Sequence, residues 1–278
     1  MSSDSAGAKT GVQALGDAEE FGPAVEQTAP GVFTLDFGSL ARFVVSFEDR
    51  SVRLVAARPE ADQDTIDHLL DDHIAPRIIA ADGTLVLHGS SIVVGSHLVA
   101  FLGGTGSGKS TFAASMHGIG HRLLGDDAIV ISDKGGVLHG EAVYPSLRLY
   151  RRSIEQVFDR SVETSPMAFY SDKLHVAAPE FGSPAPEQFP LGAVFFLSEG
   201  DAITLETTYP SDACFGLVEN SFAFDPNDQT GAMHRMAKAA RVVSAVPCYE
   251  LTYPHDFGQL GEVRAQALAA LAHLSPPA

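Results

Sequence analysis

The segment Phe101-Leu-Gly-Gly-Thr-Gly-Ser-Gly-Lys-Ser-Thr111 constrains the fold more than any other part of the chain. Its residues from Gly103 to Ser110 match the pattern G-x-x-x-x-G-K-[ST]. An apolar stretch, Leu98–Leu102, precedes this pattern, and an amphipathic stretch, Thr111–His117, follows it. The order predicts a strand, a glycine-rich loop and a helix, which together make a binding site for phosphate groups.

Each residue type in this loop has a physical reason to be there. Glycines let the backbone curl until several N–H groups point at one spot, and the helix adds unpaired N–H groups and the positive end of its dipole. The side chain of Lys109 is expected to reach the β- and γ-phosphates of a nucleotide, and the hydroxyl of Ser110 is expected to bind Mg²⁺. The predicted phosphate-binding residues of the loop are Gly103, Gly104, Thr105, Gly106, Ser107, Gly108, Lys109, Ser110 and Thr111.

A pair of acids, Asp126 and Asp127, interrupts the apolar stretch Gly120–Ile131, which we interpret as the strand that follows the loop's helix. Connections of this kind are right-handed and leave the new strand parallel to the first. Carboxylates in such a strand are costly unless a cation or a proton transfer uses them. Because consecutive strand residues point to opposite faces, we expect one acid to bind Mg²⁺ and the other to accept a proton from an attacking hydroxyl. The alternative is a solvated strand end with two surface acids.

The overall charge limits the class of partner. The chain has 278 residues and a net charge of −17, which argues against nucleic acid or an anionic membrane as the main partner. Its two cysteines, Cys214 and Cys248, are too few for a disulfide framework and are interpreted as reduced thiols in a cytoplasmic protein. No apolar run approaches the ~18 residues of a membrane span, and the first residues lack the order of a signal peptide.

The pattern along the chain divides it into three parts. Residues 1–30 lack sustained periodicity and are predicted to be a flexible tail. Residues 31–82 are predicted to form a small module, with an antiparallel meander and a helix that Asp62 or Asp64 caps and Pro76 kinks or ends. The strands predicted in this module are Val32–Phe37, Ala41–Phe47 and Ser51–Ala56.

Residues 83–278 are predicted to be an α/β domain, with a mixed sheet that has helices on its faces. Residues 160–190 contain five prolines and are expected to be irregular, although 170–176 look ordered and Lys173 there is a cation that could face phosphate. The other elements predicted in this domain are strands at 84–88, 91–94, 144–150, 191–197, 203–207 and 248–253 and helices near 153–158, 211–220, 228–243 and 258–273.

Several of these segments resemble a known family, the catalytic domain of HPr kinase/phosphorylase. The resemblance lies in Leu87-His88-Gly89, the loop GGTGSGKST, Gly120-His-Arg-Leu and Asp126-Asp127, in that order and spacing. It covers about residues 32–275. The later segments Tyr144-Pro-Ser-Leu-Arg-Leu-Tyr150, Lys173 and Pro190-Leu-Gly-Ala-Val-Phe-Phe-Leu197 are closer to the HPr-kinase-like enzymes that phosphorylate the precursor in lasso-peptide biosynthesis.

The resemblance implies a fold similar to phosphoenolpyruvate carboxykinase and an ATP-dependent kinase that phosphorylates a serine of a peptide or small protein. It implies that Asp126 is the general base and that Asp127 joins Ser110 around Mg²⁺. It also implies that His88 lies beside the reacting groups and that Arg148 lies near the transferred phosphoryl group, while Lys109 contributes to catalysis. The related enzymes are hexamers or smaller assemblies, which makes a homo-oligomer compatible with the resemblance.

The chain also departs from that family. Ser146 and Leu147 stand where HPr kinase has an acidic residue, which places one metal ligand in doubt and leaves a non-catalytic nucleotide-binding regulator as an alternative. The segment used for phosphorolysis has no counterpart, which disfavours the bifunctional HPr kinase/phosphorylase. His117 and His121 could suggest a metal site, but Gly118 and Gly120, which lie between them, break that helix, and zinc is not expected.

Overall fold

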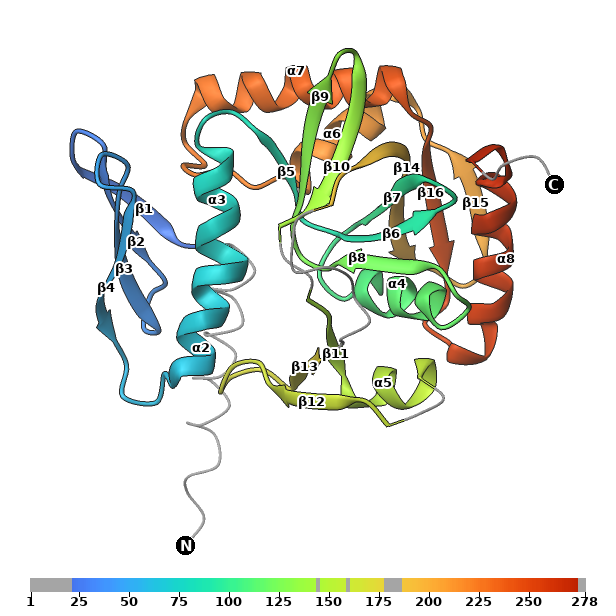
Figure 1. The fold of residues 1–278 in the computed structure, drawn as a ribbon, viewed down its shortest axis with the longest axis horizontal. Coiled ribbons are helices and arrows are strands. Elements are labelled where there is room, and N and C mark those ends of the chain that lie inside the picture. Colours follow the sequence, from blue (N-terminus) through green and yellow to red (C-terminus); the bar gives the residue numbers. More distant parts are fainter. Residues whose placement is uncertain (1–21, 144–145, 159–160, 178–186, 275–278) are drawn as a thin grey trace, which may run out of the picture. The chain divides into compact units, whose positions relative to one another are not determined.

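The computed structural model describes residues 22–143, 146–158, 161–177 and 187–274 (Figure 1). The chain divides into two compact units. The first comprises Met1–Ile74 with Pro166–Lys173, and the second comprises Ala75–Ser165 with Leu174–Ala278.

The first unit contains a 4-stranded antiparallel sheet in the order β1-β2-β3-β4, which confirms the predicted meander. Its strands are β1 (Ala24–Ala29), β2 (Val32–Asp36), β3 (Ala41–Ser46) and β4 (Ser51–Ala57). The helix α2 (Gln63–His68) follows, and the side chain of Asp62 accepts a hydrogen bond from the N–H of Thr65 at 3.0 Å. The predicted cap is therefore Asp62.

Two details of this unit differ from the sequence prediction. Ala24–Ala29 was assigned to the tail but forms β1, because an outer strand is held by main-chain hydrogen bonds to β2 and needs few apolar side chains. The rest of the predicted tail up to residue 21 lies outside the described residues. After α2 the backbone forms a π-helical segment, η1 (Leu69–Ile74), and Pro76 lies inside the next helix, so the proline does not end the helical stretch.

From residue 75 onward the chain contains both strands and helices. The elements are α3 (Ala75–Ala80), β5 (Leu85–Leu87), β6 (Ser90–Val94), β7 (His97–Leu102), α4 (Lys109–His117), β8 (Arg122–Gly125), β9 (Ile129–Lys134), β10 (Val137–Ala142), β11 (Arg148–Tyr150), α5 (Arg151–Val157), β12 (Glu163–Pro166), β13 (Lys173–Ala177), β14 (Phe189–Glu199), β15 (Thr204–Thr207), α6 (Pro210–Glu219), α7 (Gln229–Ala245), β16 (Cys248–Tyr253), η2 (Phe257–Gln259), α8 (Leu260–Ala270) and η3 (Ala272–Leu274).

A 9-stranded mixed sheet is the centre of the second unit. Its main path runs β5-β9-β10-β14-β7-β6-β8, and β16 joins β14 and β15. Strands β7, β14 and β16 are parallel, whereas β6 is antiparallel to β7. A separate 3-stranded sheet has the order β11-β13-β12. The predicted α/β class, with a mixed sheet and helices on its faces, is confirmed.

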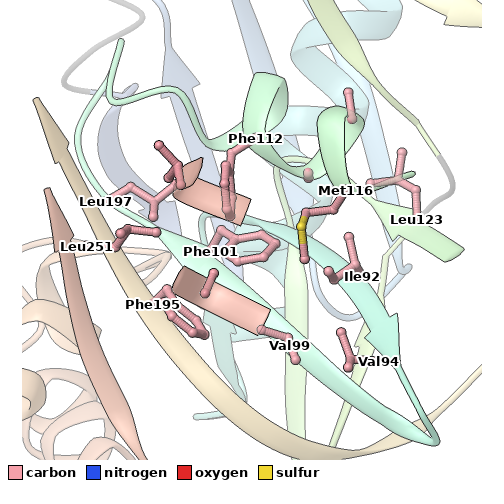
Figure 2. Packing of buried hydrophobic residues seen from close by; sticks show 14 of the residues in the cluster. Ile92, Val94, Val99, Phe101, Phe112, Met116, Leu123, Phe195, Leu197 and Leu251 are labelled. Atoms are coloured by element: carbon pink, nitrogen blue, oxygen red, sulfur yellow. The ribbon is translucent and has the colours of Figure 1, made fainter. Parts of the chain in front are cut away.

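Strand β7 is apolar and buried on both faces from Leu98 to Leu102. Val99 and Phe101 face the layer that contains α4 and α8, while Leu98, Ala100 and Leu102 face the layer that contains α6 and α7. Figure 2 shows the first layer, in which the rings of Phe101 and Phe112 meet edge to face at 5.0 Å. Burial of each such ring contributes about 2–3 kcal/mol, so the strand that carries the loop is held from both sides.

Candidate functional site

The glycine-rich loop occupies the predicted place between a strand and a helix. Strand β7 ends at Leu102 and α4 begins at Lys109. Gly103, Gly106 and Gly108 have φ angles of 141°, 81° and 91°, which side chains with a Cβ rarely adopt. The backbone therefore follows the curl that the glycines predict, and strand, loop and helix are confirmed as structural elements.

Neighbouring residues fix the two ends of the loop. A Cβ on Gly103 would lie 2.4 Å from the carbonyl oxygen of Leu197, and one on Gly108 would lie 2.5 Å from Oη of Tyr253. In contrast, Gly104 and Gly106 are exposed, and a Cβ on either would meet nothing within 4 Å. The ends of the loop are thus packed against β14 and β16, and its middle is open to a ligand.

Polar groups line this loop. The ammonium of Lys109 donates to the carbonyls of Gly103 at 2.8 Å and Gly104 at 3.1 Å, which holds it over the loop. The hydroxyl of Ser107 is buried and has no hydrogen-bond partner among the described residues. The hydroxyl of Thr111 donates to that of Ser153 at 3.1 Å and so ties α4 to α5. A buried hydroxyl without a partner in a loop of this geometry is consistent with an external acceptor such as phosphate.

The acid pair lies in a bend rather than in a strand, which corrects the sequence prediction. The predicted strand over 120–131 is divided into β8, which ends at Gly125, and β9, which begins at Ile129. Asp127 has a φ of 70°, and aspartate is one of the few residues with a side chain that tolerate this conformation. The bend at Asp127 separates two sets of strand pairings. Before it, β8 pairs with β6, and after it, β9 pairs with β5 and β10.

The position of β8 also needs a correction. Strand β6 is antiparallel to both β7 and β8, so β8 runs in the same direction as β7, as predicted. The two are not neighbours, however, because the short connection through Gly95 and Ser96 folds β6 against the edge of β7. Strand β6 therefore lies between β7, which carries the loop, and β8, which the acid pair follows.

The carboxylates of Asp126 and Asp127 have different surroundings. Asp126 is 1% exposed, and it accepts hydrogen bonds from the hydroxyl of Ser90 at 2.5 Å and from the backbone N–H of Arg148 at 3.4 Å. The side chain of Asp127 is 22% exposed and pairs with the guanidinium of Arg148. Its other oxygen lies 3.7 Å from Nε2 of His88. Asp126 is therefore enclosed, while Asp127 belongs to a cluster of charged side chains that solvent reaches.

Asn220, at the end of α6, connects the loop to this cluster. Its Oδ1 accepts from the N–H of Gly103 at 3.1 Å, and its backbone carbonyl accepts from the N–H of His88 at 2.6 Å. The ring of His88 stacks on Phe222, with centroids 5.7 Å apart and planes at 9°. Contacts therefore lead from Gly103 through Asn220 and His88 to Asp127 and then to Arg148.

Sequence reasoning did not identify Asn220 or Tyr253. Asn220 ends a predicted helix, where asparagine is common as a cap, so its bond to Gly103 had no distinctive signal. Tyr253 is buried at the end of β16, and its hydroxyl donates to the carbonyl of Ser107 at 3.4 Å. Burial raises the pKa of Tyr253, which keeps the hydroxyl protonated as a donor.

The remaining predicted residues lie outside the series of contacts from Gly103 to Arg148. Lys173 begins β13 and falls in the first unit, so its role at the loop stays a prediction. Ser146 and Leu147, which stand where the resemblance leads one to expect an acid, are described, but Tyr144 and Pro145 lie outside the described residues. No cluster of three metal-ligating side chains occurs in the described ranges, and Nδ1 of His117 lies 3.0 Å from the carbonyl oxygen of His121.

Comparison with known proteins gives little independent information. No protein-family model matches the chain, and the search of curated proteins found no relative. One solved structure that it matches is the HPr(Ser) kinase/phosphatase from Coxiella burnetii, with a TM-score of 0.33 and 12% identity over 66% of this chain and 97% of that chain. The functional proposal therefore rests on the chain's own residues. Among the described residues, no helix has the length and apolar content that a membrane crossing requires.

Proposed function

We propose that this protein is an ATP-dependent kinase that transfers the γ-phosphoryl group to a serine hydroxyl of a peptide or small protein. The observation that carries the proposal is the series of contacts from Gly103 through Asn220 and His88 to Asp127 and Arg148. It joins a loop shaped for phosphate to a carboxylate and a guanidinium. Phosphoryl transfer needs these groups together, because its catalysis consists mainly of positioning and charge neutralisation.

The described residues fit a nucleotide and its metal ion. The exposed middle of the loop, the first turn of α4 and the buried Ser107 hydroxyl form a site of N–H and O–H donors for phosphate oxygens. Ser110 and Asp127 would be the protein ligands of Mg²⁺, which commonly takes only one or two ligands from the protein when it binds with phosphates. Bound magnesium ATP would supply the phosphoryl group and neutralise part of its charge.

The side chains would act on the reacting groups in separate ways. Lys109 would move from the loop carbonyls to the β- and γ-phosphates, and Arg148 would neutralise charge that develops on the transferred group. As the acceptor oxygen bonds to the γ-phosphorus and the bond to the β-phosphate oxygen breaks, one of the two aspartates would take the acceptor's proton. His88 would orient that carboxylate.

Two assignments of the proton acceptor follow from different observations. The resemblance to HPr kinase favours Asp126, whereas the greater exposure of Asp127 and its contact with His88 favour Asp127. If Asp127 is the base, Ser110 would be left as the one protein ligand of Mg²⁺ named here, and Asp126 holds the bend in place through Ser90 and the backbone of Arg148. Replacing each carboxylate by the amide separates the two assignments.

The test is phosphorylation of serine peptides with labelled ATP and Mg²⁺, together with nucleotide binding and thermal unfolding of each variant. Loss of the general base lowers the rate about 10²–10⁴-fold, and the variant that shows this loss while it still binds nucleotide, Asp126→Asn or Asp127→Asn, identifies the base. Lys109→Ala should weaken both binding and turnover. Asp201→Asn, an exposed aspartate in a turn, is the matched control and should behave like the wild type. Absence of any labelled peptide in a screen of serine acceptors would refute the kinase.

A non-catalytic nucleotide-binding regulator is the second candidate. One observation in its favour is the ion pair with Arg148, because it occupies the carboxylate of Asp127, the proposed Mg²⁺ ligand. The other is that Ser146 and Leu147 stand where the resemblance leads one to expect an acid. The regulator predicts nucleotide binding that Lys109→Ala weakens, with no labelled acceptor. The lasso-peptide precursor is the acceptor that the resemblance suggests, and peptides that end in serine should be tested first.

A further inference from the structure

Strand β4 is an open edge of the four-stranded sheet (Figure 1). It pairs with β3 on one side, and no described strand pairs with its other side. All residues of Ser51–Ala57 are exposed. An open edge of this kind presents unpaired N–H and C=O groups to which another extended chain can bind.

Apolar side chains continue to this edge. In the register of the sheet, Val52 lies opposite Val45 and Leu54 lies opposite Phe43, so each pair shares a face. Val45 and Phe43 are buried, whereas Val52 is 38% and Leu54 is 42% exposed. The apolar face of the sheet therefore extends to the edge, where an added strand could cover it.

The opposite edge of the same sheet, β1, exposes no large apolar side chain in its described residues. Strand β1 is preceded by Pro23 and carries Glu26 and Gln27, and a bulge interrupts its pairing with β2. Proline, charge and bulges are the usual means by which an edge avoids pairing with other chains. Strand β4 also has a bulge, at Val55, and a charge, Arg53, but Val52, Leu54 and Val55 are 38%, 42% and 51% exposed. This row of large apolar side chains indicates a docking edge.

The charge of β4 indicates what kind of chain would dock. Residues 50–58 contain Arg50, Arg53 and Arg58 and no acid, in a chain with 35 acidic and 18 basic residues. Arg58 pairs with Glu60, but no ion pair of Arg50 or Arg53 occurs among the described residues. Arg53 lies opposite Val44 and so on the other face from Leu54. An added strand would meet apolar side chains on one face and arginine on the other.

We propose that the β4 edge binds an extended segment in which apolar and acidic residues alternate, and that this segment belongs to the acceptor peptide or protein. The second clause rests on the proposed kinase function, whereas the binding itself does not. The segment adds to the sheet beside β4, covers Val52 and Leu54, and places carboxylates near Arg53. A second copy of this chain fits less well, because pairing of two β4 strands would bring their arginines together.

The test uses the full chain without nucleotide and a fluorescein-labelled octapeptide that alternates Glu and Val, with binding followed by fluorescence anisotropy. The wild type should bind this peptide and not one that alternates Lys and Val. Arg53→Glu should weaken binding at least tenfold, and Leu54→Asp should abolish it. Lys134→Glu, the same change of charge at an exposed residue of β9, should leave binding unchanged. Thermal unfolding of each variant shows whether it is folded, and both β4 substitutions are at exposed positions that tolerate polar residues.

The outcomes separate this inference from the kinase proposal. Binding that Arg53→Glu and Leu54→Asp reduce, with no phosphoryl transfer to any acceptor, supports the docking edge and refutes the kinase. Equal binding by the wild type and Arg53→Glu, or no binding at all, overturns the docking edge even if serine peptides are phosphorylated. Two other results overturn it as well. One is a dimer in sedimentation that Leu54→Asp dissociates. The other is peptide binding that appears only after deletion of residues 1–21, which would assign the edge to the chain's own terminus.

Discussion

Replacing Asn220 by alanine tests the connection between the glycine-rich loop and the charged cluster. The substitution removes two side-chain hydrogen bonds, one from the N–H of Gly103 at 3.1 Å and one to the carbonyl of Gly216 at 2.8 Å. The bond from the N–H of His88 to the backbone carbonyl of Asn220 does not need the side chain. Asn220→Ala therefore releases the loop from α6 but leaves the pairing of His88 in place.

The size of the effect follows from which groups lose a partner. The carbonyl of Gly216 keeps the backbone N–H of Asn220 at 3.0 Å, whereas the N–H of Gly103 loses the Asn220 oxygen at a half-buried position. Each bond contributes about 0.5–1.5 kcal/mol net, so the free energy of unfolding should fall by about 2 kcal/mol. For a chain of this size that corresponds to about 4–8 °C in the melting temperature.

The measurements are urea unfolding and nucleotide affinity by calorimetry. Because the released N–H lies at the start of the loop, we expect the affinity for ATP to fall about tenfold, or 1.4 kcal/mol. Asn227→Ala is the matched control, since Asn227 is exposed and its described hydrogen bond uses only its backbone N–H. If Asn220→Ala and Asn227→Ala have the same unfolding free energy and the same affinity, Asn220 does not connect the two parts of the site.

Two further predictions concern the packing under the loop and the effect of pH. Gly108→Ala should destabilise the fold by about 2–4 kcal/mol, because its Cβ would lie 2.5 Å from Oη of Tyr253 at a φ of 91°. In a Tyr253→Phe background, part of this loss of unfolding free energy should disappear. If the effects of the two substitutions are strictly additive in a double-mutant cycle, the contact is contradicted. Burial raises the pKa of Cys248 from 9.0 to about 11, so the folded protein retains a proton that the unfolded chain releases. The unfolding free energy should therefore fall as the pH rises from 9 to 11, by about 1–3 kcal/mol for this group. In Cys248→Ala, the unfolding free energy measured by urea titration should fall less steeply with pH across that range. An unchanged dependence on pH would exclude the thiol as its cause.

The sequence predicted the elements whose patterns are local. Alternation in residues 32–57 was sufficient for the meander, and the continuous apolar run Leu98–Leu102 was sufficient for a strand buried on both faces. The loop between that strand and Lys109 also followed directly, because both glycines that the pattern requires, Gly103 and Gly108, have positive φ. These features depend on residues close together in the chain.

The prediction failed where distant segments decide the structure. The stretch 120–131 has the composition of one strand, but the left-handed Asp127 divides it between two parts of the sheet. The hydrogen bond from Gly103 to Asn220 joins residues 117 positions apart, and a pattern of neighbours contains no information about it. The roles assigned to Asp126, Asp127, His88 and Arg148 stay predictions.

The burial of Asp126 affects how related sequences should be compared. Because its carboxylate holds the bend between β8 and β9, a protein with this fold would be under selection to keep it whether or not it is an enzyme. An aspartate at this position is thus a marker of architecture. Asp127 beside it is constrained as well, by its left-handed backbone and by its ion pair with the buried Arg148, so an intact acid pair does not by itself distinguish an enzyme from a binding protein.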